Sequence, residues 1–296
     1  MNEPSGPLVS AEWLAGRLAD PDLRVVHVSS SRRVYDREHL PGAAFGALIG
    51  ELGLRGTAPE TGDAERESLV PSRDHLEATL ARWGVREGDR VVFYDDIGQN
   101  RHAVRGYWLL RLYRYPRDRV HVLDGGLAAW QRAGGSVAAT DTDVAAVGAE
   151  PAPRPPVRLG EQDPALIATY DDVVAWSREA PAGGTARLLD MRTSAEFEGA
   201  DVRSRRAGHV PGARHRPFED LLAPDGTFRP LDEMLAIIRG CGAEPGELRA
   251  TYCQTGARSA LGWFVLHELA GFTNVRNYAG SWEEWGNRDD SPIEAG

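Results

Sequence analysis

The second half of this sequence repeats the first half, and this duplication limits the possible folds more than any other feature. Residues 76–95 match residues 234–253 without a gap. The stretch EHLPGA at 38–43 returns as GHVPGA at 208–213, and VLDGGLAAW at 122–130 returns as NYAGSWEEW at 277–285. Because the matches keep their order and span most of each half, they indicate a duplicated domain rather than a short stacking repeat.

Each half alternates short apolar segments with helical patterns. This alternation predicts the α/β class, with two domains that each have a mostly parallel sheet flanked by helices. We expect an N-terminal domain at 1–140, a linker rich in Pro, Ala and Asp at 141–164, and a C-terminal domain at 165–296. In parallel sheets, ligands bind at the carboxyl ends of strands, and Cys253 lies at one of these predicted ends.

Charge and composition exclude several classes of function. A net charge of −10 argues against non-specific binding to nucleic acid or to an anionic membrane. The sequence contains no lysine, which excludes a lysine phosphate loop and a Schiff-base lysine. The first twenty residues do not resemble a signal peptide, no apolar run has the length of a membrane span, and two cysteines make no disulfide framework. We therefore expect a cytoplasmic protein, and a monomer, because two packed domains can bury their own apolar faces.

The duplication distinguishes the two cysteines. Cys241 lies opposite Trp83 after a predicted helix, so we interpret it as a small buried hydrophobic residue. Cys253 lies opposite Asp95 at the end of a predicted strand, and the loop that follows Asp95 is two residues longer. Two copies that agree in scaffold but differ at this loop indicate an active second domain and a non-catalytic first one.

The segment CQTGARS has the features that stabilise a thiolate. A helix is predicted to begin near Arg258 or Ser259, and its N-terminus would present unpaired N–H donors. Gly256 is suited to the positive φ of an anion-binding loop, and Arg258 adds a permanent positive charge. Since a thiolate is the reactive form of cysteine, the sequence predicts that Cys253 is a nucleophile.

Taken together, the strand ending in Cys253, the loop to Arg258, the H-x-P-G-A turn in both halves and the closing NYAGSW resemble the tandem-domain rhodanese family. Within the family, the resemblance points to thiosulfate sulfurtransferases of the actinobacterial type. It implies two rhodanese domains of which only the C-terminal one is catalytic, and a ping-pong sulfur transfer through a persulfide of Cys253. It implies neither a metal nor an organic cofactor. The substrates expected from it are a small anionic sulfur donor and a thiol or cyanide acceptor.

The resemblance also assigns roles along the site. The loop that would cradle the substrate comprises Gln254, Thr255, Gly256, Ala257, Arg258 and Ser259. In the segment LLDMRTSAEFEG, Asp190 would be a buried acid that orients its neighbours, and Arg192 a cation reaching toward the substrate. For Glu196, an exposed acid at a helix start and a functional acid are equally good interpretations.

Residues outside these two segments have supporting roles. The histidines of the H-x-P-G-A turns, His39 and His209, are expected to be mainly structural. Trp282 is expected to pack beside the active-site loop.

The donor is the least determined part of this prediction. We expect thiosulfate, but Gln254-Thr255 is neither the Arg-Lys typical of many thiosulfate-using members nor the Gly-Ser/Thr of mercaptopyruvate-using members. The alternative is therefore a 3-mercaptopyruvate sulfurtransferase.

Other classes of function are compatible with parts of the pattern. A cysteine phosphatase usually has five residues between Cys and Arg, whereas four separate Cys253 from Arg258. A Cys-His-Asp hydrolase built from Cys253, His209 and Asp190 is disfavoured, because the histidine turn recurs in the half that lacks the cysteine. A non-enzymatic module that hands a persulfide to a partner protein stays open.

Overall fold

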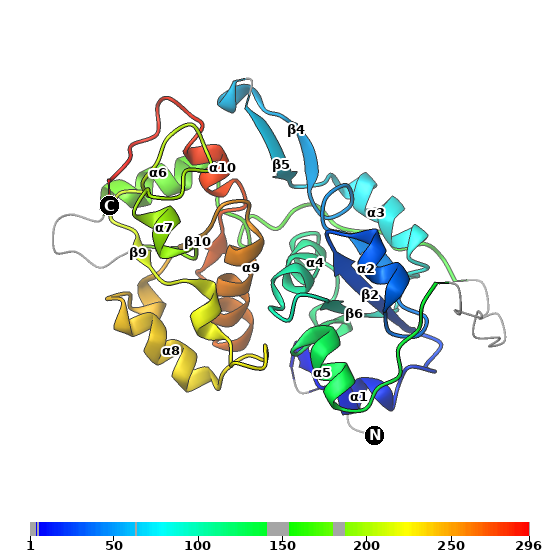
Figure 1. Cartoon of the computed structure of the whole chain (residues 1–296). Coiled ribbons are helices and arrows are strands. Elements are labelled where there is room, and N and C mark those ends of the chain that lie inside the picture. Colours follow the sequence, from blue (N-terminus) through cyan, green and yellow to red (C-terminus); the bar gives the residue numbers. More distant parts are fainter. Residues whose placement is uncertain (1–3, 5, 63, 141–153, 180–186, 296) are drawn as a thin grey trace. The chain divides into compact units, whose positions relative to one another are not determined.

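The computed structural model describes residues 4, 6–62, 64–140, 154–179 and 187–295 (Figure 1). The chain divides into two compact units. The first comprises residues 1–52, 71–162 and 224–228, and the second comprises 53–70, 163–223 and 229–296. The division at 162/163 lies close to the predicted start of the second domain at 165. Most of the predicted linker, residues 141–153, lies outside the described residues.

The first unit is built on a parallel sheet with strand order β1-β7-β6-β2-β3. Its strands are β1 (Leu8–Val9), β2 (Leu23–Ser29), β3 (Ala44–Ala47), β6 (Arg90–Asp95) and β7 (Val120–Leu123). Its helices are α1 (Ala11–Ala15), α2 (Arg32–Arg37), α3 (Arg73–Arg82), α4 (Arg101–Leu112) and α5 (Gly126–Arg132).

The second unit repeats this plan with a parallel sheet of order β11-β10-β8-β9. Its sheet strands are β8 (Leu188–Asp190), β9 (Arg214–His215), β10 (Ala250–Tyr252) and β11 (Arg276–Asn277). Its helices are α6 (Tyr170–Glu179), α7 (Ser194–Phe197), α8 (Leu231–Gly240), α9 (Ala257–Trp263), a π-helical continuation at Phe264–Leu269, and α10 (Ser281–Trp285). Strand β1 has a reduced counterpart here, a single parallel bridge between Ile167 and Asn277.

Alternation along the central strands places a hydrophobic layer on each face of each sheet. On β6, Val92 and Tyr94 belong to the buried cluster that includes Leu14 of α1 and Trp130 of α5. On β10, Ala250 and Tyr252 belong to a cluster with Val173 of α6 and Trp282 of α10. Neighbouring strand residues face the other way, toward α4 in the first unit and α9 in the second, because successive side chains in a strand alternate between faces. The predicted fold class is confirmed.

The repeat is visible in atomic contacts as well as in sequence. Tyr94 and Tyr252 hold equivalent positions on β6 and β10, and both side chains are buried. The Tyr94 hydroxyl accepts the N–H of Leu40 at 2.9 Å, and the Tyr252 hydroxyl accepts that of Val210 at 3.2 Å. Leu40 and Val210 follow the histidines of the two H-x-P-G-A turns. In both units, the tyrosine hydroxyl therefore binds the turn to the central strand of the sheet.

Two short segments belong to one unit although they lie in the half of the sequence that forms the other. The units are therefore not contiguous in sequence, unlike the predicted domains 1–140 and 165–296. The antiparallel hairpin β4 (Leu54–Thr57) and β5 (Glu65–Leu69) comes from the first half but belongs to the second unit. Residues 224–228 come from the second half but belong to the first unit, where Asn100 donates to the carbonyl of Gly226 at 2.8 Å and the Phe228 N–H donates to Asp124 at 2.9 Å. Sequence periodicity does not predict this exchange, because the hydrogen bonds of Asn100 to Gly226 and of Phe228 to Asp124 join residues more than a hundred positions apart.

Within the part of the chain that the structure describes, every helix is too short or too polar to cross a lipid bilayer.

Candidate active site

The cysteine lies at the point where β10 gives way to a tight loop. Strand β10 ends at Tyr252, and Gly256 takes the left-handed conformation, with φ of 86°, immediately before α9 begins at Ala257. The helix therefore starts one residue earlier than the sequence pattern predicts. A residue with a Cβ is strained at such a φ, so glycine is the natural choice for a turn this short.

The sulfur of Cys253 is surrounded by hydrogen-bond donors and is buried. The N–H of Gly256 donates to Sγ at 3.1 Å. Burial alone would raise the pKa of the Cys253 thiol, but the charge of Arg258 and hydrogen bonds from Ser259 and Thr255 outweigh burial, and the pKa is lowered. The site therefore favours the thiolate, which is the nucleophilic form.

Arg258 is held by Glu196. The two side chains form a bidentate pair of 2.6 Å and 2.7 Å, and both are buried. Glu196 also completes a capping box with Thr193 at the start of α7. Although burial opposes ionisation, the hydrogen bonds from Arg258 and Thr193 hold the pKa of Glu196 at about 2. The interpretation of Glu196 as an exposed acid at a helix start is wrong, because its carboxylate is buried and bound to Arg258. A functional role for Glu196 stays a prediction.

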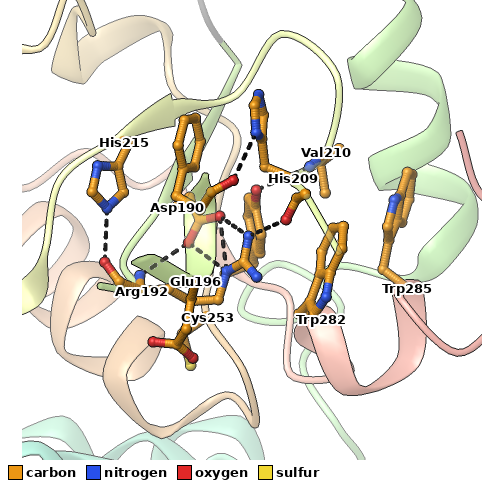
Figure 2. A network of polar contacts seen from close by, with 12 residues as sticks. Asp190, Arg192, Glu196, His209, Val210, His215, Cys253, Trp282 and Trp285 are labelled. Carbon is orange, nitrogen blue, oxygen red and sulfur yellow. Dashed lines mark hydrogen bonds and ion pairs between the residues drawn. The ribbon is translucent and has the colours of Figure 1, made fainter. Parts of the chain in front are cut away.

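Arg192 does not lie as expected for a cation that reaches toward a substrate. Its guanidinium donates to both carboxylate oxygens of Asp190, at 2.7 to 3.0 Å, and to the carbonyl of Gly208 at 2.8 Å (Figure 2). The guanidinium also lies over the ring of Trp282, 4.4 Å from its centroid. The reason is local: a strand end that buries Asp190 requires a counter-charge, and Arg192 two residues later supplies it. The predicted role of Asp190 in orienting its neighbour matches this geometry.

The first turn of α10 holds the backbone of the cysteine loop. The N–H groups of Trp282 and Glu283 donate to the carbonyls of Cys253 and Gln254, each at 2.9 Å. The hydroxyl of Ser281 accepts the N–H of Cys253 at 3.1 Å and lies 4.0 Å from its sulfur. Trp282 thus lies beside the active-site loop, as the sequence predicts.

The remaining residues of the Cys253 loop bind neighbouring side chains. Gln254 donates to the hydroxyl of Ser204 at 3.2 Å, and Ser259 donates to Asn277 at 2.7 Å. Ala257 and Ser259 are buried, whereas Thr255 is partly exposed. Gly256, Arg258, Ser259 and Thr255 act on the Cys253 thiol, whereas the side chain of Gln254 turns to Ser204. Substrate binding by the loop residues stays a prediction.

The histidine of the H-x-P-G-A turn has other partners than the cysteine. The Nδ1 of His209 contacts the carbonyl of Phe197 at 3.1 Å, and its Nε2 lies 3.7 Å from Glu294. His39 in the first unit likewise contacts the carbonyl of Tyr35, at 2.6 Å. Because Asp190 is engaged by Arg192, these partners do not form the Cys-His-Asp relay that a hydrolase requires.

Sequence reasoning missed Ser281, Glu283 and His215. The Nε2 of His215 lies 2.8 Å from the carbonyl oxygen of Arg192, which accepts the hydrogen bond. Ser281 has a left-handed φ of 51°, which is uncommon for a residue other than glycine. The duplication offered a signal for Ser281, because its counterpart in the first half is Gly126.

No group of three or more His, Cys, Asp and Glu side chains among the described residues is arranged to hold a metal ion.

A family model, sequence relatives and a solved structure all resemble this chain. The family model described as "Rhodanese-like domain" matches residues 10–133 and 173–288. A protein of Corynebacterium glutamicum named "Thiosulfate sulfurtransferase" is 35% identical over 98% of this chain and 90% of its own length. One of Pseudomonas aeruginosa named "Probable 3-mercaptopyruvate sulfurtransferase" is also 35% identical, over 99% of both chains. The solved structure of SseA from Escherichia coli, described as a 3-mercaptopyruvate sulfotransferase, matches with a TM-score of 0.71 and 26% identity over 94% of this chain and 99% of its own.

Proposed function

The chain belongs to the rhodanese family, and we propose that it transfers the outer sulfur of thiosulfate to a thiol or to cyanide through a persulfide of Cys253. The observation that carries the proposal is the Gly256 N–H donating to Sγ at 3.1 Å, in a loop where the thiol pKa is lowered. Sulfurtransferase chemistry is supported by the relatives from Pseudomonas aeruginosa and Corynebacterium glutamicum, each of which is named a sulfurtransferase. The choice of thiosulfate, the persulfide and a cytoplasmic location belong to the proposal.

In the first half-reaction, the Cys253 thiolate attacks the sulfane sulfur of thiosulfate. A new S–S bond forms to Sγ while the bond between the two thiosulfate sulfurs breaks, and sulfite leaves with that electron pair. Because the thiolate is preformed, this step needs no general base. The N–H donors of the loop then face the added sulfur, which carries the negative charge of the persulfide.

In the second half-reaction, a nucleophilic acceptor attacks the outer persulfide sulfur. Cyanide becomes thiocyanate, or a thiolate becomes a persulfide, and the Cys253 thiolate leaves with the electron pair of the broken bond. The enzyme returns to its starting state, so neither step needs a metal or a redox cofactor.

The positive charge near the donor has to be reassigned, because the guanidinium groups of Arg192 and Arg258 are buried against carboxylates, whereas that of Arg203 is accessible although it also has carboxylate neighbours. Arg203 is half-exposed, with its guanidinium 3.7 Å from Glu196 and 2.8 Å from Asp201. Its backbone carbonyl lies 3.5 Å from the Gln254 amide nitrogen, so the residue lies beside the cysteine loop. We assign the recruitment of the anionic donor to Arg203, with Arg258 acting on the thiolate itself.

Mass spectrometry of the intact protein tests the reaction directly. After incubation with thiosulfate and removal of excess reagent, we expect a gain of one sulfur atom that cyanide removes. Cys253→Ser should gain none, and Cys241→Ser, which changes the other thiol, should gain one. A wild-type protein without the adduct, or an adduct that persists in Cys253→Ser, contradicts the proposal.

The donor is decided by comparing kcat/KM for thiosulfate and 3-mercaptopyruvate. The second candidate rests on a specific observation, the equal 35% identity to the Pseudomonas aeruginosa relative. Thiosulfate should be the better donor; a higher kcat/KM for 3-mercaptopyruvate reverses the assignment. An aryl phosphate and a persulfide-accepting protein, assayed alongside, test the phosphatase and relay alternatives.

A further inference from the structure

The carbonyl groups just beyond β10 lack a neighbouring strand and depend on α10. Strand β10 pairs with β8 as far as Tyr252 and with β11 only as far as Thr251. Beyond that point, the carbonyls of Cys253 and Gln254 are held by the N–H groups of Trp282 and Glu283. The position of the nucleophile therefore depends on where the first turn of α10 lies.

The side chain of Glu283 connects that turn to the hairpin. Its Oε1 accepts the backbone N–H of Glu67 on β5 at 2.8 Å, and its Oε2 lies 3.8 Å from Nε of Arg66. Both Glu283 and Arg66 are buried, and Arg66 is also held by Glu60 at 3.3 Å. Glu283 thus binds the cysteine loop through its backbone N–H and the hairpin through its carboxylate.

The hairpin supplies the groups that offset the cost of burying the Glu283 carboxylate. Burial raises the pKa of Glu283, and the groups that oppose this effect are the N–H of Glu67, the charge of Arg66 and the N–H of Ser68. All three belong to β5. A buried carboxylate that loses such partners becomes unstable in its position and moves or protonates.

We propose that Glu283 is a positioning residue through which the hairpin 54–69 sets the geometry of the Cys253 loop. The hairpin holds the Glu283 carboxylate, Glu283 and Trp282 hold the carbonyls of Gln254 and Cys253, and the loop N–H groups are thereby aimed at the sulfur. The inference rests on the proposed function for its kinetic consequences, but not for its effect on the thiol. It gives the first half of the sequence a part in catalysis, although its own strand-end loop has no cysteine.

The test measures the thiol directly, without any sulfur donor. Thiolate formation is followed by ultraviolet absorbance against pH in a Cys241→Ser background, with Cys253→Ser as the blank. In Glu283→Ala the titration midpoint of the Cys253 thiol should rise by about one pH unit, because the loop N–H groups are no longer aimed at the sulfur. One pH unit corresponds to a tenfold change in the ratio of thiolate to thiol. The kcat for sulfur transfer should fall about tenfold, a typical penalty for small misplacement of a reacting group.

Two further variants separate positioning from simple loss of stability. Glu283→Gln keeps an oxygen that accepts the Glu67 N–H, so its titration should stay within about 0.3 pH unit of the parent. Glu67→Pro removes the N–H donor from the hairpin while every side chain of the cysteine loop stays intact, and it should shift the titration in the same direction as Glu283→Ala. The matched control is Arg55→Ala, which removes an exposed hairpin arginine 3.3 Å from Glu67 and should change nothing.

The outcomes are distinct. If Glu283→Ala lowers the melting temperature but titrates like the parent, Glu283 is only structural and the inference is wrong. If Glu283→Ala does not fold, Glu67→Pro decides: an unchanged titration overturns the inference. A shifted titration in a protein that forms no persulfide would uphold the inference and contradict the proposed function instead.

Discussion

The strand-end loop of the second unit holds Cys253, whereas the equivalent loop of the first unit holds Asp95. Both are followed by a residue in the left-handed conformation, Gly256 with φ of 86° and Asn100 with φ of 56°, and then by a helix. Both anionic groups accept a backbone N–H from the loop or helix start, at 3.1 Å for Cys253 and at 3.2 Å for Asp95, whose donor is His102. The scaffold for holding an anion is therefore present in both copies.

The two loops differ in the charged side chains at the start of the helix that follows. The second residue of α9 is Arg258, while the second residue of α4 is His102, whose pKa is lowered to about 4 by burial. Burial and the neighbouring Asp96 raise the pKa of Asp95 to about 6, whereas the pKa of Cys253 is lowered. In the first unit, the backbone N–H groups of His102 and Ala103 and the charge of Arg101 together do not outweigh the burial of Asp95. In the second unit, the charge of Arg258 and the hydrogen bonds of the loop do outweigh the burial of Cys253, so Arg258 is the cation that distinguishes the anion site.

Removal of that cation should have the largest effect. In Arg258→Met the Cys253 pKa should rise and kcat/KM at neutral pH should fall about 100-fold, because both thiolate fraction and loop geometry suffer. The buried Glu196 also loses its partner, at a cost of about 3–5 kcal/mol in the free energy of unfolding. Steady-state kinetics and urea unfolding measure the two effects. Arg239→Met, which breaks an exposed pair with Glu244, is the control and should cost less than about 1 kcal/mol; an Arg258→Met enzyme as active as this control would contradict the account.

In the first unit, Asp95 should destabilise the fold as pH rises. Its folded pKa of about 6 exceeds the unfolded value of about 3.8, so stability is lost as pH increases through this interval, by at most about 3 kcal/mol. Asp95→Asn should therefore be more stable than the parent at pH 7.5 and show a smaller difference at pH 4. Urea midpoints at the two pH values measure this, and sulfur transfer should be unchanged. A variant that is less stable at both pH values would show that the Asp95 carboxylate is compensated by contacts beyond those described.

Ser281→Gly should have the smallest effect. Ser281 and its counterpart Gly126 both have left-handed φ, of 51° and 57°, and a Cβ on Gly126 would lie 2.4 Å from the carbonyl oxygen of Asp95. The glycine relieves about 1 kcal/mol of strain and loses one hydrogen bond to the Cys253 N–H, so stability should change by less than about 1 kcal/mol. We expect kcat to fall about threefold. A clear gain in stability with unchanged kcat would show that the Ser281 hydroxyl has no part in positioning Cys253.

Much of the fold and the position of the nucleophile follow from the sequence, because hydrophobic alternation and internal repetition are local signals. The gapless match puts Cys253 and Asp95 at one position, and the structure places them at equivalent strand ends. The two-residue difference between the loops also follows, since two residues separate Cys253 from Gly256, the cap of α9, and four separate Asp95 from Asn100, the cap of α4.

The partners of charged side chains could not be predicted in the same way. Whether Arg192 faces a substrate or Asp190 depends on a side-chain direction that the D-x-R pattern does not specify. The contact between Glu283 and Glu67 joins residues 216 positions apart through a backbone N–H, which leaves no mark on residue type. Such long-range polar contacts are invisible to periodicity, although they determine which cations are available to a ligand.

The proposed sulfur transfer depends most on the ionisation of Cys253, and the difference titration of its thiolate measures this directly. The protein in a Cys241→Ser background is compared with the double variant that also carries Cys253→Ser. We predict a midpoint clearly below the value of about 8.5 for an unperturbed cysteine, and a rise in that midpoint in Arg258→Met. A midpoint at or above 8.5 in the parent would contradict the claim that this strand end is built to hold a thiolate.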